Sequence, residues 1–126
     1  MEFSDEKQAP ASIYQRYLES GRLGFQRCRA CDSAVFYPRV ICPVCGGDSL
    51  EWQESAGRGK VYATTAVSRR NEEPYNVALV DLDEGFRMMS RVEGVAAEEV
   101  RIGTAVVLEV RREDDEPVVV FVTEGR

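Results

Sequence analysis

The chain has 126 residues, of which 44% are hydrophobic and 30% are charged, and its formal net charge at pH 7 is −6. This length is sufficient for one ordinary domain, or for a small metal-binding module beside a compact second domain. The acidic balance argues against a general nucleic-acid-binding protein, because such proteins usually present a strong basic patch.

Two absences from the sequence narrow the class of protein further. The sequence contains no histidine, so the commonest general base and the usual partner of a nucleophilic serine or cysteine is missing. It also contains no apolar run of membrane-spanning length, and residues 1–7 lack the basic and apolar regions of a signal peptide. We therefore expect a cytoplasmic protein without a membrane contact and without the common hydrolase or acyl-transfer machinery.

Residues 10–20 are predicted to form a short helix that ends at Gly21. Four apolar residues recur on one face of this helix: Ile13, Tyr14, Tyr17 and Leu18. A helix this short is only marginally stable alone in water, so its apolar face must pack on another surface. That surface is either the rest of this chain or a partner protein.

The only cysteines of the chain form two Cys-x-x-Cys turns: Cys28, Cys31, Cys42 and Cys45. Two residues between cysteines allow a tight knuckle to aim both sulfurs at one ion, and backbone N–H groups can hydrogen-bond the thiolates. Four thiolates suit Zn²⁺ in tetrahedral geometry, with iron as the alternative ion and two disulfides as the alternative chemistry. Because four cysteines leave no open coordination position, the expected metal is structural.

Short strands are expected on either side of the two knuckles. Residues 23–27 enter the first knuckle, residues 35–37 return from it, and residues 50–54 leave the second knuckle. The segment 23–54 is therefore predicted to be a zinc ribbon, with too few apolar residues to fold well without its metal. Trp52 is expected at the junction between this ribbon and the domain that follows.

The remainder of the chain has the pattern of a small β domain. Five strands are expected, at residues 60–68, 75–82, 86–92, 104–111 and 118–122, with a single helical turn at residues 96–100. This count and the inserted turn favour a Greek-key barrel of the OB type, although the periodicity alone also fits an SH3-like barrel.

The predicted fold class is therefore mainly β, in three parts. A short N-terminal helical segment spans residues 1–22, a rubredoxin-like zinc ribbon spans residues 23–54, and a five-stranded OB-fold barrel spans residues 55–126.

Motifs along nearly the whole chain resemble those of a known family. They are Leu23-Gly24-Phe25-Gln26-Arg27-Cys28-Arg29-Ala30-Cys31, Phe36-Tyr37-Pro38-Arg39, Cys42-Pro43-Val44-Cys45-Gly46, Trp52, Ser55-Ala56-Gly57-Arg58-Gly59-Lys60-Val61-Tyr62, Pro74-Tyr75, Val77-Ala78-Leu79-Val80 and Val100-Arg101-Ile102-Gly103. In this order they resemble the small acyl-CoA-associated zinc-ribbon/OB-fold proteins known as domain of unknown function 35. One departure is Asp32, where a glycine often follows the first knuckle.

The resemblance implies a non-catalytic accessory subunit. Members of this family commonly accompany thiolase-like enzymes, which include thiolases, aldolases acting on CoA thioesters, and acyltransferases. They bind the enzyme, keep it soluble and help to form its acyl-CoA channel, while the chemistry stays on the enzyme. The lack of histidine and of free cysteine in this chain agrees with such a role in lipid metabolism.

Six residues are candidates for contact with acyl-CoA. Arg39, Arg69 and Arg70 are candidates for the CoA phosphates, because a guanidinium group matches phosphate in a two-pronged way. Three aromatic residues are candidates for lining an acyl or pantetheine path, or for covering the partner: Phe36, Tyr37 and Tyr75. The alternatives are solvated charge for the arginines and ordinary packing between ribbon and barrel for the aromatic residues.

Two other functions remain open from the sequence. OB folds bind single-stranded nucleic acid with aromatic platforms and a basic groove, although the net charge argues against this function here. A stand-alone enzyme would have to use Asp81, Asp83 or Tyr75, which are more simply explained as turn and strand-end residues.

Overall fold

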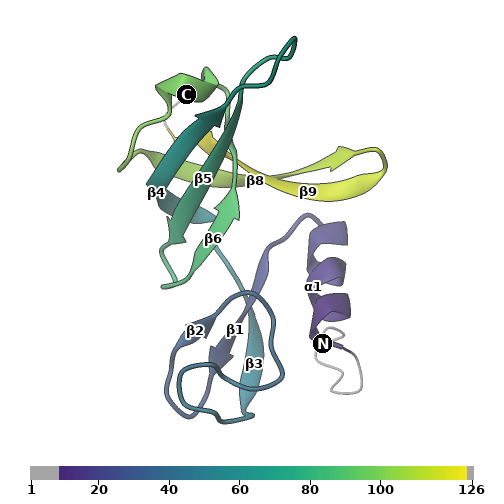
Figure 1. Cartoon of the computed structure of the whole chain (residues 1–126). Coiled ribbons are helices and arrows are strands. Elements are labelled where there is room, and N and C mark those ends of the chain that lie inside the picture. Colours follow the sequence, from purple (N-terminus) through teal and green to yellow (C-terminus); the bar gives the residue numbers. More distant parts are fainter. Residues whose placement is uncertain (1–8, 125–126) are drawn as a thin grey trace.

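A computed structural model describes residues 9–124 of the chain, and Figure 1 shows a helix, a small sheet and a larger sheet. The elements are α1 (Pro10–Glu19), β1 (Gly24–Cys28), β2 (Ala34–Val35), β3 (Leu50–Glu54), β4 (Arg58–Val67), β5 (Tyr75–Leu82), β6 (Arg87–Ser90), β7 (Val92–Glu93), the 3₁₀ turn η1 (Ala97–Glu99), β8 (Ala105–Glu113) and β9 (Glu116–Thr123). Residues 1–8 and 125–126, at the ends of the predicted segments 1–22 and 55–126, lie outside the described residues. No helix within residues 9–124 has the length and apolar character to cross a membrane.

Helix α1 begins at the predicted residue and ends at Glu19, one residue before the predicted end. Pro10 occupies the first turn, where its missing N–H removes no intrahelical bond. At the other end Gly21 adopts φ +80°, a left-handed conformation that glycine enters without strain. The N–H groups of Gly21 and Arg22 then donate to the carbonyls of Leu18 and Tyr17, each at 2.9 Å, so the last turn is capped by the backbone.

The apolar face of α1 packs on this chain. Leu18 joins the main hydrophobic core, and the Tyr17 ring stacks on Trp52 with 5.6 Å between ring centroids. Glu19 also pairs with Arg112 near the end of β8, at 3.2 Å. Of the two surfaces predicted for the helix, its own chain is therefore the one that covers this face, and Trp52 contacts the helix.

The ribbon is a three-stranded antiparallel sheet in the order β2–β1–β3. Gln26 of β1 lies opposite Val35 of β2 on one side and Trp52 of β3 on the other. Strand β2 ends at Val35, so the predicted strand over residues 35–37 is wrong at its far end. The chain leaves the sheet there because Phe36 turns to stack on Phe86, with ring centroids 4.9 Å apart.

The larger sheet has the order β6–β5–β4–β8–β9–β7. Its two edge strands, β6 and β7, are consecutive in the chain and are separated only by Arg91. Val92 of β7 pairs in parallel with Phe121 of β9, so the predicted single strand 86–92 is divided between the two edges of the sheet. This division places two consecutive strands on opposite edges, and their hydrogen bonds do not close the sheet into a complete barrel. The predicted helical turn is found as η1, between β7 and β8.

Two local features shape the barrel strands. The register between β4 and β5 shifts between Val61 and Ala63, which bends β4. A Cβ atom at Gly59 would collide with the backbone oxygen of Asp81, so only glycine allows this close approach of β4 and β5. The predicted acidic turn between β8 and β9 is confirmed, and both of its central residues, Asp114 and Asp115, have positive φ.

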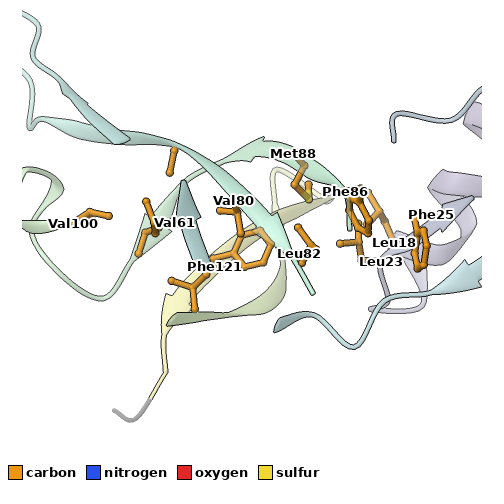
Figure 2. Packing of buried hydrophobic residues seen from close by; sticks show 13 residues of the cluster. Leu18, Leu23, Phe25, Val61, Val80, Leu82, Phe86, Met88, Val100 and Phe121 are labelled. Atoms are coloured by element: carbon orange, nitrogen blue, oxygen red, sulfur yellow. The ribbon is translucent and has the colours of Figure 1, made fainter. Parts of the chain in front are cut away.

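The main hydrophobic core runs from the barrel into the ribbon. Figure 2 shows its side chains as a row, from Val100 and Val61 at one end to Leu23 and Phe25 at the other. The ring of Phe25 stacks on Phe86 with 4.9 Å between centroids. Because the ribbon and the barrel share these contacts, their relative orientation is fixed by packing.

Candidate functional site

The four cysteines converge on one point between the two knuckles. Their Sγ atoms all lie within 4.8 Å of one another, with 3.6 Å between Cys28 and Cys45 and 3.7 Å between Cys31 and Cys42. A tetrahedral zinc ion with Zn–S bonds of about 2.3 Å separates its sulfurs by about 3.8 Å. A disulfide would require about 2.05 Å between sulfurs. The arrangement therefore fits a four-thiolate metal site and excludes two disulfides.

Local backbone geometry aims the thiolates at this point. The N–H groups of Val44 and Gly47 donate to the Sγ atoms of Cys42 and Cys45, each at 3.4 Å. On the first knuckle, hydrogen bonds with the side chain and backbone of Ser33 lower the pKa of Cys31 to about 6, which favours the thiolate, the form that binds metal. At Cys45 the Gly47 N–H lowers the pKa, but hydrogen bonds with the Cys28 and Cys31 sulfurs outweigh it and raise the pKa to about 11. Without the ion, the cluster therefore shares protons, and metal binding must release the proton of Cys45.

The residue after the first knuckle accounts for the one departure from the family pattern. Asp32 adopts φ +64°, in the left-handed region that glycine adopts most easily. Aspartate tolerates this region better than most residues do, because its short side chain can hydrogen-bond locally. The knuckle therefore keeps its shape with aspartate in place of glycine.

The metal site has only a small apolar surrounding of its own. Cys28 and Cys42 are buried with Val35, and Leu50 packs against them, whereas Cys45 is exposed. Such a cluster is too small to stabilise a fold, so metal coordination must supply much of the ribbon's stability.

The six candidate acyl-CoA residues do not form one site. Arg69, Arg70 and Tyr75 lie at the loop between β4 and β5, which projects from the barrel away from the ribbon (Figure 1). The other three candidates belong to the ribbon segment that follows β2: Phe36, Tyr37 and Arg39. A ligand bound to this chain alone would therefore meet one group or the other.

The loop group has a contact of its own. The Arg69 guanidinium lies 5.8 Å from the centre of the Tyr75 ring and also donates to the Tyr75 hydroxyl at 3.4 Å. A shallow pocket of about 190 Å³ lies beside Tyr75 and is lined in part by Asn76 and Val92. This volume is below the roughly 300–1,000 Å³ typical of small-molecule sites.

In the ribbon group, Phe36 has a packing role. Its ring contacts Phe86, and it meets the edge of Tyr14 with centroids 5.5 Å apart. Burial raises the pKa of Tyr14 to about 12, so this phenol stays neutral at physiological pH. Tyr37 and Arg39, by contrast, are exposed.

Sequence reasoning missed Glu84, one of the residues at the connection between the ribbon and the barrel. The Glu84 carboxylate accepts hydrogen bonds from the Ser55 hydroxyl at 2.8 Å and from the Ala56 N–H at 2.7 Å. The Glu84 carbonyl also accepts from the Arg27 guanidinium at 3.1 Å. In the sequence Glu84 is only the middle of an Asp-Glu-Gly turn, so no local signal distinguishes it from a solvated charge.

Asp81, one of the carboxylates considered for a stand-alone enzyme, already forms an ion pair. Asp81 accepts two hydrogen bonds from Arg87, at 2.6 and 3.3 Å, and the Arg87 guanidinium lies 3.4 Å from the centre of the Tyr62 ring. A shallow pocket of about 380 Å³ beside this pair is lined partly by Gly85 and Phe86. Asp81 is thus held as an ion-pair partner.

Family models match both parts of the molecule. Residues 17–51 match the model described as "ChsH2, rubredoxin-like zinc ribbon domain", and residues 52–111 match "ChsH2, C-terminal OB-fold domain". The fold and the cysteine site thus define a zinc-ribbon/OB-fold protein, which confirms the predicted fold class.

Relatives with curated names extend this assignment. DUF35 domain-containing scaffold proteins of Methanothermobacter thermautotrophicus and Pyrococcus furiosus are 30% and 36% identical to this chain, over 118 and 110 residues. These matches cover 86% of both chains in the first case, and 82% of this chain and 80% of the relative in the second. The chain belongs to the DUF35 family.

A further relative is much longer than this chain. The "Probable enoyl-CoA hydratase alpha subunit" of Thermomonospora curvata is 38% identical over 99 residues, which cover 75% of this chain and 31% of that protein. This chain thus spans about a third of the length of that relative.

Two solved structures share the fold. A chain of the "Ltp2-ChsH2(DUF35) aldolase" superposes with a TM-score of 0.80 and 31% identity, and the match covers 92% of this chain and 95% of that one. A DUF35 protein of unknown function from Sulfolobus solfataricus gives a TM-score of 0.68 at 16% identity, over 94% of this chain and 89% of that one. The second likeness concerns the fold alone.

Proposed function

We propose that this chain is a non-catalytic accessory subunit that binds an acyl-CoA-processing enzyme of the aldolase or thiolase-like type and helps to form its acyl-CoA channel. The observation that carries the proposal is the likeness to the chain from the Ltp2-ChsH2(DUF35) aldolase, which extends over 92% of this chain. The relatives described as scaffold proteins support the same role. The proposal places the chain in the lipid metabolism of the cytoplasm.

The chemistry of the described residues supports a non-catalytic role. The four thiolates close a tetrahedral site, which leaves no coordination position for a substrate. Asp81 is paired with Arg87, and the whole sequence lacks histidine. The reacting groups are therefore assigned to the enzyme subunit.

The metal is assigned an architectural role within this function. Zn²⁺ would hold Cys28, Cys31, Cys42 and Cys45 and would fix the two knuckles relative to each other. The visible absorption spectrum of the purified protein distinguishes the two metals, because a four-thiolate iron site is coloured and a zinc site is colourless.

The acyl-CoA channel is proposed to lie between this chain and the enzyme. The exposed candidates Arg39 and Tyr37 on the ribbon and Arg69 and Tyr75 on the barrel loop belong to separate groups. A partner surface that reaches one of these groups would complete a binding path with phosphate-binding arginine and an aromatic wall. Neither group offers a deep pocket that would hold a CoA thioester without the enzyme.

The arginines of the barrel give little support to the nucleic-acid alternative. Arg58 pairs with Glu124, and Arg87 pairs with Asp81. Arg111 is held between Glu93 and Glu109. A phosphodiester backbone would have to displace these carboxylates, in a chain whose net charge is −6.

Co-expression tests the proposed function. The chain is produced with the thiolase-like or aldolase protein encoded beside it, and the mixture is separated by size-exclusion chromatography with light scattering. We expect a stable complex in fixed proportion, whose enzyme activity is lower when the accessory chain is omitted. Separate elution of the two proteins, with full activity from the enzyme alone, would overturn the proposal.

A further inference from the structure

The segment from residue 37 to residue 44, which runs from the end of β2 into the second knuckle, exposes four large apolar side chains. Tyr37 is 49% exposed, Val40 68%, Ile41 56% and Val44 67%. We call these four residues the knuckle patch. Several exposed apolar side chains in one short segment of a small soluble protein favour an interaction site over chance exposure. None of the four side chains belongs to a buried cluster of the described residues, so the stability of the ribbon does not explain them.

Charge is depleted in the same stretch of chain. Between Asp32 and Asp48 the only charged residue is Arg39, although 30% of the whole chain is charged. The centre of a protein interface is poor in charge and enriched in tyrosine and arginine. These are also the residue types that dominate binding energy when they are truncated. The composition of the loop is thus that of an interface centre.

The loop is also held rigid from beneath. Gln26 is only 3% exposed, and its Oε1 accepts from the Arg39 N–H at 2.7 Å while its Nε2 donates to the Arg39 carbonyl at 2.8 Å. Both backbone groups of Arg39, which lies between Tyr37 and Val40, are therefore fixed by one buried side chain. Two metal ligands, Cys42 and Cys45, fix the end of the same loop. A surface ordered before binding loses little conformational entropy in the complex.

The other exposed apolar residues lack this arrangement. Tyr62 and Tyr75 lie beneath Arg87 and Arg69, so their rings already have cationic partners. Ile102 is 70% exposed in the turn before β8, and Met89 is 59% exposed on the edge strand β6. Isolated exposure of this kind is normal and indicates no partner.

We propose that the knuckle patch is the surface through which the ribbon contacts the enzyme subunit, an inference that rests on the proposed function. The matching surface of the enzyme is apolar at its centre and carries a carboxylate opposite Arg39. A second copy of this chain is a poorer occupant, because a two-fold contact presents the same surface twice and would bring two Arg39 side chains together. The loop from residue 33 to residue 47 contains no acidic residue to neutralise them.

Substitution of the patch tests the inference. The affinity of the enzyme for the accessory chain is measured by titration calorimetry with wild type and with the triple variant Val40→Ser/Ile41→Ser/Val44→Ser. We expect the dissociation constant to rise at least about 100-fold, because the complex would remove these three apolar side chains from water together. The matched control is Ile102→Ser, which removes an isoleucine that is at least as exposed as Ile41 from the barrel and should change the dissociation constant less than about 2-fold.

A second variant keeps the test decisive if the triple variant folds poorly. Arg39→Glu alters only an exposed side chain, since the contacts to Gln26 use the Arg39 backbone. We expect it to weaken binding at least about 10-fold, through repulsion of the partner carboxylate. Metal content and the circular dichroism spectrum report the integrity of the ribbon in every variant.

The outcomes separate this inference from the function on which it rests. If wild type does not bind the enzyme, the proposed function fails and the inference fails with it. If wild type binds, and folded triple and Arg39→Glu variants bind equally well, the function stands and the patch is refuted. If the triple variant abolishes self-association of the chain but leaves enzyme binding intact, the occupant is a second copy and the inference is likewise overturned.

Discussion

The barrel is stabilised by burial of apolar side chains, whereas the ribbon depends on four thiolates and on a few contacts shared with its neighbours. The barrel strands bury several side chains almost completely, among them Val80, Val106 and Phe121. The ribbon's own buried cluster consists of Cys28, Val35 and Cys42. A metal ion can thus rigidify a surface without a large core behind it. The ribbon is thereby left able to expose apolar residues.

Loss of the metal is the largest change that this comparison predicts. Structural zinc in small domains contributes about 10–16 kcal/mol of apparent binding free energy, which is also folding free energy. Cys42→Ser should therefore lose the ion and the order of the ribbon, while most of the barrel stays folded. Amide NMR spectra would show collapsed dispersion for residues 24–54 and retained dispersion for residues 58–123. Exposed Ser49→Ala is the control, and an unchanged ribbon spectrum after metal loss would contradict the comparison.

Truncation of a side chain in the barrel core should destabilise the barrel and leave metal binding by the ribbon intact. Phe121 is fully buried, so Phe121→Ala should lower the free energy of unfolding by about 3–5 kcal/mol. The knuckles should still bind metal, because the thiolates do not contact this side chain. Urea denaturation measures the first effect, and cobalt absorbance measures the second. Exposed Met89→Ala is the control; a loss below about 1 kcal/mol for Phe121→Ala would mean that the barrel relies on something else.

The connection between the two regions should have an intermediate effect. Glu84→Gln keeps the size of the side chain but removes its charge, which weakens its hydrogen bonds to Ser55 and Ala56. Loss of hydrogen bonds to a charged group costs about 1–3 kcal/mol. Residual dipolar couplings should also show looser alignment of the ribbon relative to the barrel. The neighbouring exposed change Asp83→Asn should leave both measurements unaltered, and equal behaviour of the two variants would refute the role of Glu84.

The smallest predicted effect concerns the charges on the barrel. Burial opposes ionisation of Glu93, but the hydrogen bond from Arg111 and the charges of Arg91 and Arg111 outweigh it and lower the pKa of Glu93. A lowered folded-state pKa stabilises the protein above the unfolded value of 4.5, and this stabilisation is lost as the pH falls through the folded value. Glu93→Gln should therefore flatten the acid limb of the stability curve, at a cost of up to about 1 kcal/mol near neutral pH. Thermal melts from pH 3 to 7 measure this, with exposed Glu98→Gln as the control; a parallel acid limb in both variants would contradict it.

Local signals made much of this fold predictable. The spacing of the cysteines is a covalent constraint on one ion, so it indicated both the ribbon and its ligands. The end of α1 depended on Gly21, and the β8–β9 turn depended on a short acidic sequence, which are both features that adjacent residues determine. Strand positions followed from alternation of apolar and polar residues, because the face of a strand that is buried repeats every second residue.

The features that were missed depend on residues far apart in the chain. Strand β2 is short because Phe36 leaves the sheet for Phe86, and no local pattern reveals that attraction. The division at Arg91 arises because β6 pairs with β5 whereas β7 pairs with β9. The candidate arginines looked equivalent in the sequence, yet only the folded chain separates Arg39 from Arg69. Contacts to the acyl-CoA and to the enzyme remain predictions of the proposed function.

The stacked rings at the ribbon–barrel contact bear on how proteins of this kind can recombine. Phe25 and Phe36 come from the ribbon, and both stack on Phe86 from the turn between β5 and β6. A mismatch of volume at such a contact costs about 1–5 kcal/mol. A ribbon transplanted from a relative would keep its metal but would lose the ring stacking that holds it on the barrel, unless a matching ring replaced Phe86. When ribbon and barrel are recombined between relatives, we therefore expect the three aromatic residues to be exchanged together.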